Sequence, residues 1–285
     1  MSSLAPLPAF LYEPIVRTAL MEDFGQAGDV TSAAVIPADH VSELALISRQ
    51  VGVLAGIEVA AMAFRLVDPV IAITPLLRDG EALAPGTVIA RLSGPTRGLL
   101  GGERTALNFL GHLSGIASVT AAIVASVKGT RAAIVCTRKT TPGLRALEKY
   151  AVRAGGGANH RFGLDDAVLI KDNHVAAAGS VTEAIARAKA HVGHMVKIEC
   201  EVDRLDQLDE ALAAGVDAVL LDNMGPAQLA EAVRRIDGRA LAEASGRVTP
   251  DTAPAIAASG VDLISVGWIT HSAPVLDIGL DVLES

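Results

Sequence analysis

The sequence predicts an α/β protein in which a parallel sheet covered by helices follows a smaller, β-rich domain. Three observations support this prediction. In the second half of the chain, apolar strand-like runs alternate with helical segments. Before about residue 103, short β-branched runs are separated by Gly and Pro instead. The chain has 285 residues, 51% of them hydrophobic, which is enough for one domain and a smaller second one.

The elements of the first half are predicted from local pattern. Residues 1–24 indicate a short helix, and between about 25 and 103 several runs indicate strands of a small domain. Apolar residues at three-to-four spacing predict a helix from Glu103 to Val127. The first helix would carry Leu11, Ile15, Thr18 and Ala19 on one face, and the strand-like runs are 43–49, 52–55, 70–75 and 87–92.

Six apolar runs then alternate with helical segments, which predicts a parallel sheet. Buried parallel strands read as continuous apolar runs, and these six do. The predicted strands are 132–137, 167–170, 195–199, 218–221, 240–242 and 263–266, and the predicted helices include 182–191, 205–214, 226–236 and 252–258.

The residues after these strands indicate whether the sheet is open or closed. An open dinucleotide-binding sheet needs a Gly-rich turn after its first strand, but Arg138 and Lys139 follow here, and the glycine cluster 155–157 follows a helix. Polar residues follow nearly every other strand as well. A site built from several strand ends is typical of a βα barrel. We therefore expect an α/β barrel, incomplete because six strands and not eight are visible.

We expect two domains from these elements. Residues 1–112 would form the N-terminal domain and residues 113–272 the barrel. The first helix and the tail 273–285 could pack with either domain.

Charge is distributed unevenly along the chain. There are 24 basic and 32 acidic residues, a net charge of −8, which argues against nucleic-acid or acidic-membrane binding. The segment 128–172 nevertheless holds nine basic and four acidic residues, leaving 15 basic and 28 acidic residues elsewhere. A basic island of +5 in an acidic protein predicts a site for a small anion.

The two cysteines, Cys136 and Cys200, lie in apolar runs and are interpreted as buried, reduced thiols. The N-terminus lacks the positive region of a signal peptide. The weakly charged stretch 51–64 is broken by Glu58 and too short to cross a bilayer. We therefore expect a cytoplasmic protein that contacts neither membrane nor nucleic acid.

Cationic residues follow the first two predicted strands. The Arg138 guanidinium could grip a carboxylate with two hydrogen bonds, and the Lys139 ammonium suits phosphate. His160 and Arg161, after the triple glycine, could receive a second carboxylate. Lys171 follows the second strand and could be a Schiff-base nucleophile or an anion ligand. For His174, a loop or helix-capping role is an alternative to a binding role.

Carboxylates and small residues follow the later strands. Glu201 and Asp222 end neighbouring strands, where they suit Mg²⁺ with several waters or ribose hydroxyls. One side of the third predicted strand and its exit carries Lys197, Glu199 and Glu201, because residues two apart in a strand point the same way. If that side faces the inside of the barrel, all three side chains would be shielded from solvent. Phosphate-binding turns of a barrel are indicated by the small residues Ser245, Gly246 and Gly267.

Five segments, in this order, resemble the quinolinate phosphoribosyltransferase family, also called nicotinate-nucleotide pyrophosphorylase (carboxylating). They are 137–145, 155–161, 169–174, 220–223 and 243–246, and the resemblance extends over nearly the whole chain. The resemblance implies an N-terminal domain like an open β-sandwich and an incomplete α/β barrel. It also implies transfer of a phosphoribosyl group to quinolinate with loss of CO₂ and pyrophosphate, giving nicotinate mononucleotide for NAD biosynthesis. The implied cofactor is Mg²⁺, with no organic cofactor.

The resemblance also implies roles for individual residues. It implies a homodimer with shared active sites, in which each site receives an arginine from the partner subunit, and a higher oligomer is an open alternative. The quinolinate cradle would be Arg138, His160, Arg161 and Lys171, with Arg104 from the other subunit. Phosphoribosyl pyrophosphate would contact Lys139, Lys171, Glu201, Asp222, Ser245, Gly246, Arg247, Gly267 and His271. The catalytic residues would be Lys139, Lys171, Glu201 and Asp222, with Glu201 and Asp222 near Mg²⁺.

Two residues depart from the family pattern, and three alternatives stay open. Arg247 stands where a second glycine is usual, and Trp268 where a smaller residue is common. The alternatives are a family relative associated with molybdenum transport operons, a Schiff-base aldolase, and a binding protein without catalysis. The last would need Arg138 and Arg161 but not Glu201 and Asp222.

Overall fold

The structure is a computed structural model that describes residues 4–282. The chain divides into two compact units. The first runs to Ala121 and also includes Thr140–Gly156 and the chain from Ile269 onward. The second comprises Ala122–Lys139 and Gly157–Trp268. The predicted domain boundary between residues 112 and 113 stays a prediction.

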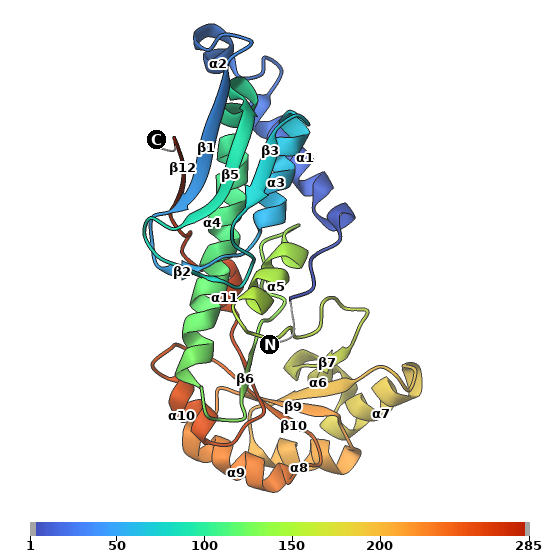
Figure 1. Cartoon of the computed structure of the whole chain (residues 1–285). Coiled ribbons are helices and arrows are strands. Elements are labelled where there is room, and N and C mark those ends of the chain that lie inside the picture. The colour runs from blue at the N-terminus through green and yellow to red at the C-terminus, as the bar shows by residue number, and fades with distance from the viewer. Residues whose placement is uncertain (1–3, 283–285) are drawn as a thin grey trace. The chain divides into compact units, whose positions relative to one another are not determined.

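The first unit contains a four-stranded antiparallel sheet in the order β12-β1-β5-β3 (Figure 1). A ribbon of β2 and β4 and several helices accompany it. The strands are β1 (Val41–Ser48), β2 (Gly52–Val53), β3 (Ala72–Pro75), β4 (Ala82–Leu83), β5 (Val88–Pro95) and β12 (Ile278–Val282). The helices are η1 (Ala9–Leu11), α1 (Glu13–Phe24), α2 (Val30–Val35), α3 (Ile57–Val67), α5 (Arg145–Ala154) and, shared with the second unit, α4 (Thr96–Ser126) and α11 (Trp268–His271).

The four strand-like runs predicted for this unit overlap β1, β2, β3 and β5, which confirms that part of the prediction. The strands β4 and β12 and the helices α2 and α3 were not predicted. The predicted first helix is divided, since Leu11 belongs to the separate 3₁₀ turn η1, and the buried residues of α1 are Val16 and Leu20. In α3, Glu58 and Arg65 are the two charged residues of an otherwise apolar run, so its helical periodicity is weakly marked in the sequence.

The helix α4 contains a stretch without charged residues that is longer than the segment 51–64, which the sequence analysis considered as a possible membrane span. Among the described residues it is the one helix long and apolar enough to cross a membrane, by length and composition only. More than half of its most apolar part is buried inside the protein. Core helices of soluble proteins pass the same test, so this is weak grounds for a membrane span.

The second unit is a six-stranded parallel sheet in the order β6-β11-β10-β9-β8-β7. Every strand pairs with its neighbour in sequence except at the seam, where β6 pairs with β11, and no ladder joins β6 to β7 among the described residues. The incomplete barrel is therefore confirmed. Its strands are β6 (Ala133–Val135), β7 (Val168–Ile170), β8 (Ile198–Val202), β9 (Ala218–Asp222), β10 (Leu241–Ser245) and β11 (Leu263–Ser265). Its helices, several of which line the outer side of the sheet in Figure 1, are α6 (Asp172–Ala178), α7 (Val181–His191), α8 (Leu205–Ala214), α9 (Pro226–Ile236) and α10 (Ala253–Ala258).

The pairing register gives this sheet two chemically different faces. Ala218 pairs with Glu199 on one side and Leu241 on the other. Paired residues of neighbouring parallel strands point to the same side of the sheet, and so does every second residue along one strand. The inner face therefore carries Glu199, Glu201, Asp222, Glu243 and Ser245. The other face is apolar and buried, and Cys200 lies there as a free thiol whose pKa burial raises to about 12. The prediction that both cysteines are buried and reduced is confirmed.

Candidate active site

The carboxyl ends of the barrel strands bring together most of the residues predicted to form the site. Arg104 and His271 are the exceptions, because they belong to the first unit, where Arg104 is exposed on α4 and His271 ends α11. In the second unit lie Arg138, Lys139, His160, Arg161, Lys171, Glu201, Asp222, Ser245, Gly246, Arg247 and Gly267.

The segment after β6 is held by short-range contacts. The Thr137 hydroxyl accepts a hydrogen bond from the Lys139 backbone N–H at 3.0 Å. A Cβ at Gly267 would lie only 2.9 Å from Lys139 Cδ, so a glycine after β11 lets the lysine stem pass closely. The ends of two neighbouring strands, β6 and β11, thus present Lys139 and Gly267 together.

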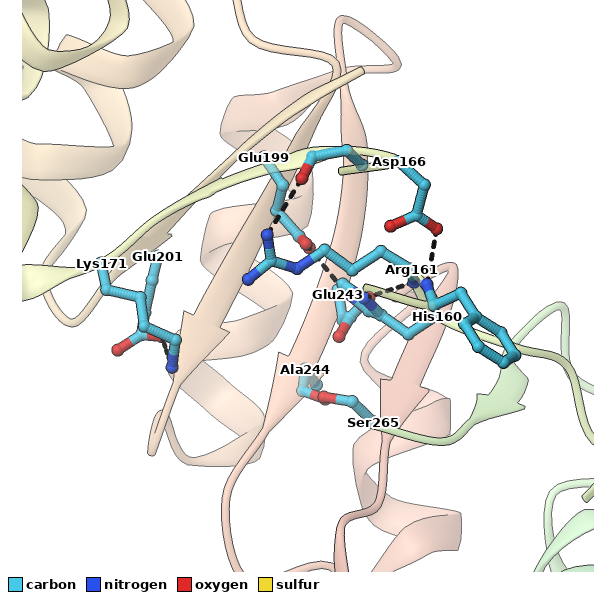
Figure 2. Close-up of polar contacts among 11 residues, drawn as sticks. His160, Arg161, Asp166, Lys171, Glu199, Glu201, Glu243, Ala244 and Ser265 are labelled. Atoms are coloured by element: carbon cyan, nitrogen blue, oxygen red, sulfur yellow. Dashed lines mark hydrogen bonds and ion pairs between the residues drawn. The ribbon is translucent and has the colours of Figure 1, made fainter. Parts of the chain in front are cut away.

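Arg161 is held by the loop that precedes β7. Its guanidinium donates to the Ala167 carbonyl at 2.9 Å (Figure 2). The loop itself is braced by Asp166, which accepts the backbone N–H groups of Phe162 and Gly163. Burial, and then the nearby charge of Arg138, lowers the pKa of Arg161 from its ordinary value. Two guanidinium groups close enough to repel one another are a setting for an anion.

His160 points into the inner face of the sheet toward two buried glutamates (Figure 2). Its Nε2 lies 2.8 Å from Glu199 Oε2 and 3.7 Å from Glu243 Oε2. Its Nδ1 accepts the backbone N–H of Arg161 at 2.7 Å. Both ring nitrogens therefore have partners within the chain. A direct contact between His160 and a substrate carboxylate stays a prediction.

The sequence analysis assigned no role to Glu199 or Glu243. Both are on inner-face positions of β8 and β10, with 7% and 1% of the residue exposed. Glu199 lies two residues before Glu201, and Glu243 lies two residues before Ser245. Together with the strand pairing, this spacing could have placed both glutamates on the same face of the sheet as the predicted site residues. The prediction that Lys197 would also be shielded was wrong. It precedes β8, its side chain is 77% exposed, and it pairs with Asp217 at the opposite end of the barrel.

Lys171 and Glu201 form an ion pair of 3.0 Å between the ends of β7 and β8 (Figure 2). The Lys171 amine thus has a carboxylate partner within the chain, and this geometry favours a role as a charged ligand over that of a Schiff-base nucleophile. The backbone N–H of Lys171 donates to His174 Nδ1 at 2.9 Å, which confirms the helix-capping interpretation of His174.

Two sets of carboxylates could take part in metal binding. His160, Glu199 and Glu243 bring ligand atoms within 4.8 Å of one another, which is close enough to hold a metal ion. Glu201 and Asp222 lie on the inner face of the adjacent strands β8 and β9, near their carboxyl ends. Mg²⁺ commonly takes one or two carboxylates together with substrate phosphates, and this second pair fits that pattern.

The turn after β10 has an unusual backbone. Gly246 has φ +107°, and a Cβ there would lie 2.3 Å from Asn223 Oδ1. The next residue, Arg247, is exposed and has φ +48°, a left-handed conformation that favours glycine. Trp268 occupies its position by donating from Nε1 to the Val248 carbonyl at 2.8 Å. The departure at Arg247 thus falls on a position where the backbone itself prefers glycine.

Cations and carboxylates gathered at the ends of parallel strands are the arrangement of an α/β-barrel protein with a site for a small anion. Comparison with known proteins is more specific. Residues 29–114 match the model of the quinolinate phosphoribosyl transferase N-terminal domain, and residues 116–281 match that of the C-terminal domain. The chain belongs to the quinolinate phosphoribosyltransferase family.

Individual relatives agree over nearly the full length. A nicotinate-nucleotide pyrophosphorylase [carboxylating] of Mycobacterium leprae is 47% identical over 272 residues, covering 94% of this chain and 95% of the relative. A probable enzyme of the same name from Bacillus subtilis is 44% identical, with coverages of 93% and 91%. The crystal structure of NadC from Streptococcus pyogenes has a TM-score of 0.94 at 42% identity, covering 97% and 98% of the two chains.

Proposed function

We propose that this protein transfers the phosphoribosyl group of phosphoribosyl pyrophosphate to quinolinate and releases CO₂ and pyrophosphate. The product would be nicotinate mononucleotide, an intermediate of NAD biosynthesis. One observation carries the proposal: Arg138, Arg161 and Lys171 lie with Glu201 and Asp222 at one end of the parallel sheet. A binding protein for anions would have no need of these two carboxylates.

The cationic side chains suit quinolinate, which is a dianion. Arg138 and Arg161 would each receive a carboxylate, since a guanidinium offers two parallel hydrogen bonds to carboxylate oxygens. Lys171 would lie between the two substrates, and His160 would complete the cradle. Arg104 would be supplied by the partner subunit. Charge and orientation, not covalent chemistry, would be the contribution of these residues.

The phosphoribosyl pyrophosphate side would include Lys139 and the loops after β10 and β11. Ser245, Gly246 and Gly267 would approach the 5-phosphate, with Arg247 and His271 as further contacts. Glu201 and Asp222 would hold the ribose hydroxyls and stabilise positive charge on the ribose as pyrophosphate leaves. Mg²⁺, held near these two carboxylates, would neutralise charge on the departing pyrophosphate.

The order of bonds follows from this placement. The ring nitrogen of quinolinate bonds to ribose C1 as the bond from C1 to pyrophosphate breaks. The resulting pyridinium nitrogen is positive. The electron pair of the neighbouring carbon–carboxylate bond can then remain on the ring as CO₂ leaves, and that carbon takes a proton. No organic cofactor is required for this sequence.

Arg104 supports the proposal that the site is shared in a homodimer. It borders a cavity of about 510 Å³ within the first unit, together with Asn108, His112 and Thr141. A guanidinium exposed at the rim of such a cavity is available to a second copy of the chain. We propose a homodimer, with further assembly open, acting in the cytoplasm.

The direct test mixes purified protein with quinolinate, phosphoribosyl pyrophosphate and Mg²⁺. Nicotinate mononucleotide and CO₂ are expected in equal amounts, measured by chromatography and by release of label from quinolinate labelled in the departing carboxylate. Omission of Mg²⁺ with a chelator should suppress the reaction. Absence of product from folded dimer would overturn the proposal.

A further inference from the structure

The hydrogen bonds of His160 fix its protonation state and its orientation. The Arg161 backbone N–H can donate to His160 Nδ1 only if that nitrogen carries no proton. The single ring proton then lies on Nε2, which faces Glu199 at 2.8 Å. The ring is thus a neutral bridge between the backbone of Arg161 and the carboxylates inside the barrel (Figure 2).

Glu199 and Glu243 form the inner end of this bridge. Their strands flank β9, and each has one buried carboxylate oxygen, Oε1, with no hydrogen-bond partner among the described residues. Burial, followed by the charge of Glu199, raises the pKa of Glu243 to about 7, while His160 and the Ser265 hydroxyl oppose the rise. The two carboxylates therefore reach His160 from the strands on either side of β9, at positions that are largely shielded from solvent.

The cluster of His160, Glu199 and Glu243 lies close enough to Arg161 to affect how its guanidinium is held for anion binding. Glu199 attracts Arg161, and Arg138 repels it. The attraction of Glu199 and the hydrogen bond from the Arg161 backbone to His160 thus help to hold the Arg161 guanidinium beside that of Arg138, where a dianion would bind.

We propose that Glu199 and Glu243 are positioning residues for the dicarboxylate subsite, acting through His160 on the backbone and guanidinium of Arg161. His160 would then complete the cradle indirectly, as a positioning residue for Arg161, since both of its ring nitrogens have partners within the chain. The identity of the dicarboxylate as quinolinate rests on the proposed function.

The first experiment needs no substrate. Protein labelled with ¹⁵N-histidine is examined by NMR between pH 6 and 8, with the His160→Gln variant to assign the signal. We expect a neutral ring protonated on Nε2, and treatment with a chelator should leave it unchanged. A ring protonated on Nδ1, an imidazolium at pH 7, or a stoichiometric metal bound to this histidine would overturn the proposal.

The second experiment measures quinolinate and phosphoribosyl pyrophosphate binding by calorimetry, together with steady-state kinetics. Glu199→Leu and Glu243→Leu should weaken quinolinate binding about tenfold or more, as loss of supporting contacts commonly does in ligand sites. Binding of phosphoribosyl pyrophosphate should change less than threefold, and kcat at saturating quinolinate should fall far less than kcat/KM. Quinolinate binding within twofold of wild type, or equal loss for both substrates, would overturn the proposal.

Two further variants control for folding. Glu243→Gln keeps the size and shape of the side chain beside His160, so quinolinate binding should stay within threefold of wild type, and a tenfold loss would count against the proposal. Cys200→Ala removes a buried side chain from the opposite face of β8 and should lower stability without selective loss of quinolinate. If wild-type protein fails to bind quinolinate at all, the proposed function falls, and the NMR result alone decides whether the bridge exists.

Discussion

The ammonium of Lys171 lies 3.0 Å from a carboxylate oxygen of Glu201, and this ion pair joins the ends of β7 and β8. The lysine side chain is 49% exposed, so solvent screens the pair and its contribution to stability is small, at most about 1 kcal/mol. Under the proposed function, the pair would lie between the two substrates.

Lys171→Ala should therefore separate activity from stability. Loss of the ammonium should lower kcat/KM for both substrates by about 100-fold, the scale of losing one charged stabilising group. The midpoint of thermal unfolding should change little. Steady-state kinetics with each substrate varied in turn provide the measurement, and near-normal values for either substrate would refute the central role of Lys171.

Borohydride trapping distinguishes the transferase from a Schiff-base aldolase. If Lys171 acts as a charged ligand, as its ion pair with Glu201 indicates, no covalent adduct should form when carbonyl compounds and borohydride are added. Intact-protein mass spectrometry gives the readout, with a known Schiff-base aldolase as positive control. An adduct mapped to Lys171 would favour the alternative.

Subunit mixing tests whether Arg104 acts in the partner's site. Arg104→Ala and Arg138→Ala should each be nearly inactive alone, with quinolinate binding as the affected step. A mixed dimer should contain one site in which both arginines are intact, so mixing should restore up to about one quarter of wild-type activity if exchange is random. If exchange is demonstrated by differently tagged subunits and no activity returns, the shared site is refuted.

The left-handed backbone at Arg247 predicts a stability difference between two substitutions. At φ +48° a Cβ costs about 1–2 kcal/mol, partly offset by the greater flexibility of glycine in the unfolded chain. Arg247→Gly should therefore be more stable than Arg247→Ala by about 0.5–1 kcal/mol in denaturant unfolding. If the guanidinium contacts the 5-phosphate, both variants should raise KM for phosphoribosyl pyrophosphate equally. Equal stability of the two would argue that this conformation is not maintained in solution.

Glu243 predicts a pH dependence of stability. Its folded pKa of about 7 lies above the ordinary 4.5, so between these values the folded protein holds a proton that the unfolded chain has lost. The free energy of unfolding should thus fall as pH rises through this window, by about 2–3 kcal/mol in all. Glu243→Gln should lack this fall, and chemical denaturation of both proteins at pH 4.5, 6 and 7.5 measures the difference. Parallel curves for the two proteins would contradict the raised pKa.

Much of the fold could be predicted because its elements have strong local signals. The parallel strands of the barrel are largely apolar runs, so each of the six predicted strands overlaps an observed one, although β8 starts at Ile198, three residues later than predicted. The helix α3 was missed because Glu58 and Arg65 are the two charged residues of an otherwise apolar run. The strand β12 was also missed. Its pairing with β1 depends on residues more than 200 positions away, which no local pattern shows.

In the candidate site, too, some residues could be predicted from the sequence and others could not. Lys139, Lys171, Glu201 and Asp222 follow strands directly, so their meeting at one end of the barrel follows from topology. Glu199 and Glu243 lie within strands, and their approach to His160 depends on register and on the loop before β7. The strain at Arg247 is a backbone property that side-chain identity does not reveal.

The pairings that finish the two sheets have a consequence for how the chain folds. β6 meets β11 across about 130 residues, and β1 meets β12 across more than 230. In each sheet, a strand that is synthesised early can therefore pair only after one of the last strands has been synthesised. Closing such long loops also slows folding. The exposed edges of β1 and β6 would be open to improper association during that interval. Loss of the residues that form β12 should therefore lower the yield of folded protein and increase aggregation.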